Sequence, residues 1–152
     1  MHLVTFLGLL HESEKTLASS YRTVAEGHVA DVDVYYTCSE LAKQCDAHEQ
    51  SLAPVLERYG ESTVTEPERL QAAGLSETRS GSAGMLRDLQ DLYLLASFVQ
   101  ITWTLIGQAA QGLRDRELLD IVTHCESQTV IQIKWLRTRM KQAAPQALLV
   151  AS

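Results

Sequence analysis

Cysteine and proline are both scarce in this sequence of 152 residues. Three cysteines are an odd number and too few for a disulfide scaffold, so we expect reduced thiols and a cytoplasmic protein. Only three prolines and eight glycines interrupt the chain, which leaves room for long helices. No polar and apolar alternation long enough for a β-strand is present. The sequence therefore predicts an all-α fold.

Basic charge is also lacking. The chain has 13 basic and 19 acidic side chains, a formal net charge of -6, and its basic residues cluster only in the last predicted helix. Proteins that bind nucleic acid or anionic membranes carry basic patches, so we expect neither partner. The apolar stretch at the start of the chain is too short to span a bilayer, so we expect no membrane insertion there.

Motifs for phosphate binding and for catalytic nucleophiles are absent. Gly81 and Gly84 precede a predicted helix without the strand and the lysine that a phosphate-binding loop needs. No serine lies in a nucleophile elbow. Cys45 and His48 would form a dyad buried in a helical core without oxyanion donors. These absences favour a protein without catalytic activity.

The sequence does contain four long amphipathic segments. Their apolar residues recur at alternating steps of three and four, the pattern of helices that pack in bundles. The predicted helices cover residues 3–28, 34–59, 85–112 and 118–144. Short turns within the first and second pairs make each pair an antiparallel hairpin. We therefore expect an antiparallel four-helix bundle over residues 1–144, and a tail over residues 145–152 that is loose or lies on the surface.

One long crossover, from Gly60 to Gly84, joins the two hairpins. Within it, residues 65–71 are typical of a short capped helix with Pro67 in its first turn. Residues 80–84 are typical of a flexible lead into the third helix. A connection of this length can carry the chain back along the bundle, and a surface crossover is favoured over a functional lid.

Three polar residues fall on the apolar seams of the first two helices. Glu14 lies among leucines, where a carboxylate must be paired, protonated, hydrated or bound to metal. Cys45 and His48 lie three residues apart on the second helix and point inward. The interior of the bundle is therefore the candidate site.

Two helical hairpins joined by one crossover resemble the ferritin-like superfamily, which includes rubrerythrin and bacterioferritin. Glu14 followed by Leu17-Ala18 and Tyr21 is similar to the first ligand helix of that family. Residues 45–48, Cys-Asp-Ala-His, stand where the second helix carries Glu-x-x-His. Trp135-Leu136 resembles the pair that follows the ligand motif of the fourth helix. The resemblance covers residues 3–143.

The resemblance implies six positions for the ligands of a di-iron centre. These positions hold Glu14, Cys45, His48, Ala96, Thr129 and Gln132. Only Glu14 and His48 keep the identity of the family's ligands. Two irons need several carboxylates to bridge them and neutralise their charge, so we expect a bundle that has lost its di-iron centre and needs no cofactor. Glu14 would instead hydrogen-bond Tyr21, Thr129, Gln132 or His48.

Two alternatives remain open for the same residues. Glu14, Cys45 and His48 supply one carboxylate, one thiolate and one imidazole, which could hold a single zinc or iron ion if water or a fourth side chain joins them. A buried free cysteine, however, commonly acts as a small hydrophobic residue. The second alternative is a thiol-based sensor in which Cys38 and Cys45 respond to oxidants.

Apolar residues extend beyond the seams of the first and third helices. They are Phe6, Leu9 and Val29 on one and Leu94, Leu95, Phe98 and Ile101 on the other. Such a surplus indicates burial by a partner, and self-association into a homodimer is the simplest explanation. The two tryptophans are expected to pack in the core or at that interface. We therefore expect a protein that acts through its surface, as an interaction or structural module.

Overall fold

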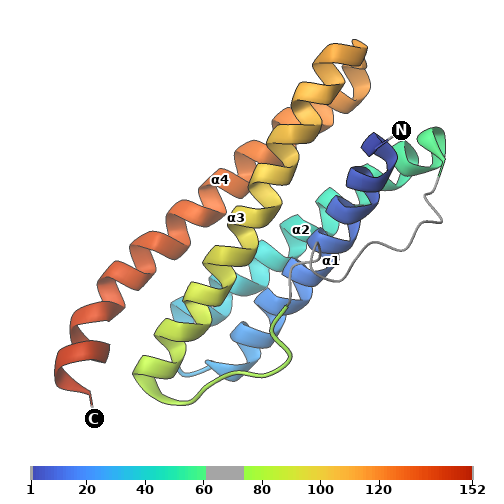
Figure 1. Ribbon diagram of the computed structural model, residues 1–152. Coiled ribbons are helices and arrows are strands. Elements are labelled where there is room, and N and C mark those ends of the chain that lie inside the picture. The colour runs from blue at the N-terminus through green and yellow to red at the C-terminus, as the bar shows by residue number, and fades with distance from the viewer. Residues whose placement is uncertain (1, 61–73, 152) are drawn as a thin grey trace.

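Four long helices make up most of the computed structural model, which describes residues 2–60 and 74–151 (Figure 1). They are α1 (His2–Gly27), α2 (Val32–Tyr59), α3 (Gly81–Leu113) and α4 (Arg116–Pro145). No strand occurs within these two ranges. The all-α prediction is confirmed. The short helix predicted for residues 65–71 lies outside the described residues.

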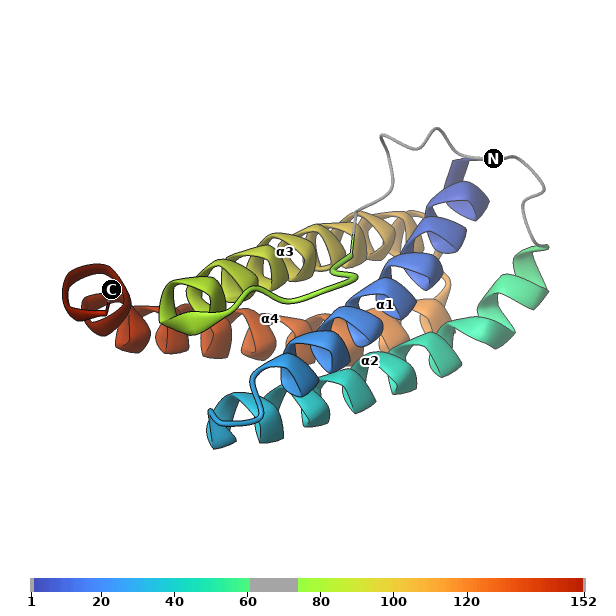
Figure 2. The same ribbon diagram turned by 90° about the horizontal axis from the view of Figure 1, so that it is seen from below.

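The helices pack as two neighbouring pairs. α1 lies along α2, and α3 lies along α4; the pairs meet where α1 contacts α3 and α2 contacts α4 (Figures 1 and 2). Among the described residues, no Cα atom of α1 lies within 8 Å of one in α4, nor any of α2 within 8 Å of one in α3, so these diagonal pairs meet only through side chains. The core between the helices contains large apolar side chains from all four: Leu7, Leu10, Leu17, Leu52, Leu89, Leu92, Ile106, Leu118 and Leu136.

The helix ends follow from local residue chemistry. Asp115 caps α4, because its side chain accepts a hydrogen bond from the backbone N–H of Leu118 at 3.1 Å. Gly60 ends α2 with a φ of 84°, a conformation that glycine adopts without strain. The expectation of a flexible lead at residues 80–84 is wrong, since α3 begins at Gly81. Arg79, just before this start, donates hydrogen bonds to Asp88 of α3, and these contacts fix the first turn of the helix.

Residues 146–150, directly after α4, are helical rather than irregular. A five-residue π-helical turn, η2 (Gln146–Val150), continues from Pro145 and contacts both α3 and α4. Ala147 is buried, whereas the next three side chains, residues 148–150, are exposed. The predicted tail is therefore an ordered turn that lies on the surface.

The apolar surplus predicted outside the seams is mostly on the surface. Phe6, Val29, Leu94 and Ile101 are exposed. Leu95 is buried, because α3 is rotated so that this residue faces the core. α3 is long and apolar enough to cross a membrane, but core helices of soluble proteins can have the same length and composition. In its most apolar window of 18 residues, 44% of the residues are buried inside the protein.

The end of the crossover is tied to α1 and α3 by a cluster of contacts around the buried Asp88 carboxylate. The His28 Nε2 atom lies 2.7 Å from Asp88 Oδ2. Arg79 donates to the same carboxylate from its backbone N–H at 3.0 Å and from its guanidinium at 2.7 Å. Thr78 packs so closely on Gly27 that a Cβ added there would lie 2.2 Å from the Thr78 hydroxyl oxygen. The crossover can therefore reach Asp88 only because residue 27 has no side chain.

We expect Gly27→Ala to lower the free energy of unfolding by about 1–3 kcal/mol, because the new methyl group displaces Thr78. Gly8→Ala is the matched control on the same helix, since a Cβ at Gly8 meets nothing within 4 Å. This control should be neutral or stabilising by up to about 1 kcal/mol. Urea unfolding followed by circular dichroism measures both. Equal effects of the two substitutions would contradict the close packing at Gly27.

Candidate functional site

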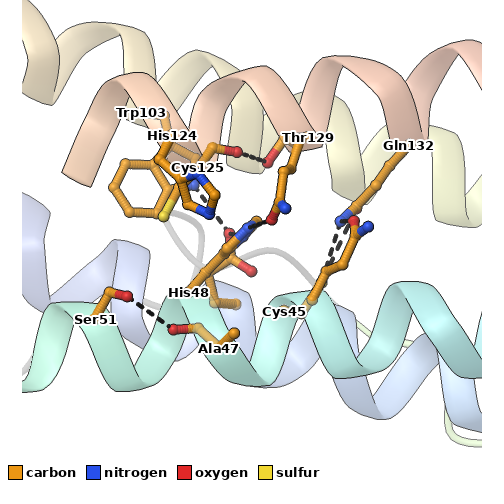
Figure 3. A network of polar contacts seen from close by, with 12 residues as sticks. Cys45, Ala47, His48, Ser51, Trp103, His124, Cys125, Thr129 and Gln132 are labelled. Carbon is orange, nitrogen blue, oxygen red and sulfur yellow. Dashed lines mark hydrogen bonds and ion pairs between the residues drawn. The ribbon is translucent and has the colours of Figure 1, made fainter. Parts of the chain in front are cut away.

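The six positions that correspond to metal ligands in the resemblance are all buried in the interior. Each side chain is at most 1% exposed, and together they come from all four helices: Glu14 from α1, Cys45 and His48 from α2, Ala96 from α3, and Thr129 and Gln132 from α4. In Figure 3, Cys45 and His48 point from α2 toward the helix that carries Thr129 and Gln132. The predicted inward orientation is confirmed.

Glu14 and His48 form a buried pair between α1 and α2. The His48 Nδ1 atom lies 3.2 Å from Glu14 Oε1, and its Nε2 atom lies 2.7 Å from the side-chain oxygen of Gln128. Both partners are acceptors, so His48 satisfies them best as an imidazolium that donates from both nitrogens. Burial alone would lower the pKa of His48, but its contacts with Glu14 and Gln128 outweigh burial and raise the pKa.

Trp103 completes the environment of the same carboxylate. Its indole Nε1–H donates to Glu14 Oε1 at 2.9 Å, and its ring lies edge-on to the His48 ring with centroids 6.1 Å apart. The sequence placed Trp103 in the core but gave it no polar partner, and it did not indicate Gln128 at all. The sequence could have indicated a polar partner for Trp103, because the N–H of a buried tryptophan usually finds an acceptor.

A second, neutral layer of contacts lies beside this pair. Tyr21 donates from its hydroxyl to Gln132 Oε1 at 3.0 Å, and Gln132 donates from Nε2 to Gln44 Oε1 at 3.1 Å. The Cys45 sulfur lies 4.0 Å from Gln132 Oε1. Thr129 donates to the backbone oxygen of Cys125 at 2.8 Å within its own helix. Of the four partners predicted for Glu14, therefore, His48 is the one that contacts it.

The thiols of the interior are protonated. Burial raises the pKa of Cys45, and the nearby Glu14 carboxylate raises it further. Burial likewise raises the pKa of Cys38 and of Cys125 to about 12. A protonated thiol is neither a good nucleophile nor a metal ligand. Cys45 therefore acts in this arrangement as a small, weakly polar core residue.

One atom of the site has no partner. Glu14 Oε2 is buried and makes no hydrogen bond within the described part of the chain. Leaving a buried carboxylate oxygen unpaired is unfavourable by about 1–3 kcal/mol. Across residues 2–60 and 74–151, no group of three or more His, Cys, Asp or Glu side chains is arranged to hold a metal ion. The Oε2 atom is thus the one unpaired carboxylate oxygen that the described interior offers.

No family model, curated protein or solved structure matches this chain. The interior must therefore be interpreted from its own geometry. That geometry combines one ion pair, one indole donor and a set of neutral amides, hydroxyls and thiols. These residues can hold a charge in a fixed place. Within the described chain, however, the Glu14 carboxylate has no second carboxylate beside it with which to bind and bridge two metal ions.

The buried pair should make stability depend on pH. Because the pKa of His48 is raised on folding, its contribution is complete below the unfolded value of about 6.5 and is lost as pH rises through the folded value. We therefore expect the difference in unfolding free energy between the native sequence and His48→Gln to shrink as pH rises above about 6.5. Urea unfolding at a series of pH values measures this difference.

Glu14→Gln is the control for that experiment. Without the carboxylate, only the contact with Gln128 opposes the effect of burial on the pKa of His48, so the decline of stability with rising pH should flatten or reverse. A difference between the native sequence and His48→Gln that does not change with pH would contradict a charged pair.

The thiols should be unreactive while the protein is folded. We expect Ellman's reagent to modify none of the three cysteines rapidly under native conditions and all three after unfolding, because burial keeps the sulfurs protonated and covered. Ser19→Cys, at an exposed position of α1, supplies a positive control that reacts at once. Fast modification of Cys38 or Cys45 in the folded native sequence would instead support the thiol sensor.

Proposed function

We propose that this chain is a ferritin-like, antiparallel four-helix bundle that has lost its di-iron centre and acts through its surface, without catalysis. The pairing of α1 with α2 and of α3 with α4 supports this fold assignment, as does the long connection from Gly60 to Gly81. In ferritin-like di-iron proteins a long crossover joins two such hairpins, and the ligands project inward from all four helices.

The observation that carries the proposal is the use of the Glu14 carboxylate. Its Oε1 atom is bound to His48 Nδ1 and to the indole N–H of Trp103. The positions that would supply further carboxylates hold Cys45, Ala96 and Thr129 instead. A pair of irons would therefore meet one carboxylate, already paired, and an imidazole whose two nitrogens both face acceptors. Oxygen activation and iron oxidation need more negative charge than this interior holds.

A single metal ion is the second candidate. It would use Glu14, Cys45 and His48 and is favoured by one observation, the unpartnered Oε2 atom of Glu14. A zinc or iron ion there would have to deprotonate Cys45 and displace His48 from Glu14 or Gln128. Both changes oppose contacts that the protein already makes. The structural pair therefore remains the better explanation.

The proposal includes a location and a partner. Three unpaired cysteines suit a reducing compartment, so we place the protein in the cytoplasm. Exposed apolar side chains on α1 and α3 suit burial against a second copy, so we infer a homodimer. The core would then stabilise the fold, while the surface makes the interactions.

Metal analysis of the purified full chain, prepared without chelator, tests the proposal. We expect zinc and iron well below one equivalent in the native sequence and in Cys45→Ser, which leaves the Glu14 and His48 pair intact and should fold. His48→Ala should be equally free of metal. One equivalent of metal in the native sequence that disappears in both variants would overturn the proposal in favour of a metal protein. Cobalt substitution would then reveal a thiolate ligand by its charge-transfer absorption.

A further inference from the structure

A stripe of apolar side chains runs along the outer side of α3. It consists of Leu94, Phe98, Ile101 and Leu105, hereafter the α3 stripe. Leu94 is 67% exposed, Ile101 and Leu105 are each 49% exposed, and Phe98 is partly buried. The spacing of four, three and four residues keeps them on one face over three turns of helix. This is the packing seam of a coiled coil, yet within the described chain no helix covers it.

The stretch of α3 that carries the stripe has no charged side chain of its own. From Leu92 to Leu113 the sequence has no acidic, basic or histidine side chain, although the whole chain has a net charge of -6. Two copies with the same net charge repel each other wherever their charged faces meet. An uncharged face avoids that repulsion. The region of α3 between Asp91 and Arg114 is therefore a long helical face suited to a second copy.

The spacing of the stripe is also symmetric. Read from either end, it gives the same steps of four, three and four, with a midpoint between Val99 and Gln100. A two-fold axis through that midpoint would pair two α3 helices in opposite directions. Leu94 would then lie against Leu105 of the second copy, and Phe98 against Ile101 of the second copy. Contacts of this kind are self-complementary, as a closed dimer requires.

We propose that the α3 stripe is the dimer interface, with two α3 helices packed antiparallel about this axis. The inference rests on the proposed function, which includes a homodimer. It adds which surface forms the dimer interface and how the two α3 helices are aligned. The four stripe residues of each copy form four apolar layers. Gln108 and Asp91 lie one step beyond the two ends of the stripe, where polar side chains can remain in water.

A lipid surface is the competing occupant, because α3 is apolar enough to enter a membrane. Helices that lie on membranes carry lysine or arginine beside their apolar face, which draws them to anionic lipid. The α3 stripe has no such residue between Arg87 and Arg114. Along the same helix, Gln100 and Thr104 contact Glu126 of α4, so that side of α3 already packs against another helix of the same chain. A second copy fits these features better than lipid.

A charge-swap experiment tests both the surface and the register. We expect the native protein to sediment as a dimer, and Leu94→Glu and Leu105→Lys each to weaken dimerisation about tenfold or more, which corresponds to about 1.4 kcal/mol. The variant with both substitutions should dimerise again, because the carboxylate introduced at one end of the stripe would meet the ammonium group introduced at the other end of the second copy's stripe. Sedimentation equilibrium measures the affinities, and circular dichroism checks that each variant remains folded.

Tyr36→Glu is the matched control. Tyr36 is 65% exposed and lies on α2, a helix with no Cα atom within 8 Å of α3 in the described chain, so its substitution should leave the dimer intact. A monomeric native protein, a dimer indifferent to the stripe substitutions, or failure of the double variant to recover would each overturn the inference. So would a monomer that binds vesicles of phosphatidylcholine and phosphatidylglycerol through the stripe.

The result can be separated from that of the metal analysis. A dimer that contains one equivalent of metal would overturn the proposed loss of the metal centre and support the α3 interface. A metal-free monomer would support the proposed loss of the metal centre and overturn the α3 interface.

Discussion

The buried pair of Glu14 and His48 is the contact on which the interior depends. Through Trp103 and Gln128 it reaches the other two helices, so each of the four helices contributes one side chain to a single network. The pair brings charged groups into a space that otherwise holds apolar and neutral polar side chains, and the pairing of the two charges makes this tolerable. Breaking a buried pair by removing one partner typically destabilises a protein by about 3–5 kcal/mol. The network therefore fixes how the helices are rotated as well as how closely they pack.

The same network explains what the interior can and cannot do. Metal centres in helical bundles use carboxylates that are free to bind, whereas here the single central carboxylate is held by an imidazolium and an indole. The neighbouring groups, such as Tyr21, Cys45 and Gln132, are neutral and contact one another. A site of this kind stabilises one arrangement of four helices. Its contacts are those of a structural core.

Much of this fold follows from sequence periodicity. The seams of the first two helices place Glu14, Cys45 and His48 in the interior, and the structure agrees. The cap at Asp115 follows the general preference of helix starts for aspartate. These features are local, because they depend on helix geometry and on neighbours within one turn.

Other features could not be predicted because they depend on how the helices are rotated against each other. Periodicity does not say which donors will reach Glu14, so the contacts of Trp103 and Gln128 were missed. Leu95 was assigned to the surface because its neighbours are apolar too, and only the observed rotation of α3 turns it inward. The early start of α3 depends on Asp88, which binds a segment that precedes it in the chain.

The shared network constrains how this sequence can drift. If Glu14 is lost, His48 loses the partner that favours its charged form and Trp103 is left as a buried donor, so a viable descendant must change several helices together. Substitutions at these positions are therefore strongly coupled in their effects on stability. The four residues will be kept or abandoned as a set, and a lineage that abandons them must refill the interior with apolar side chains.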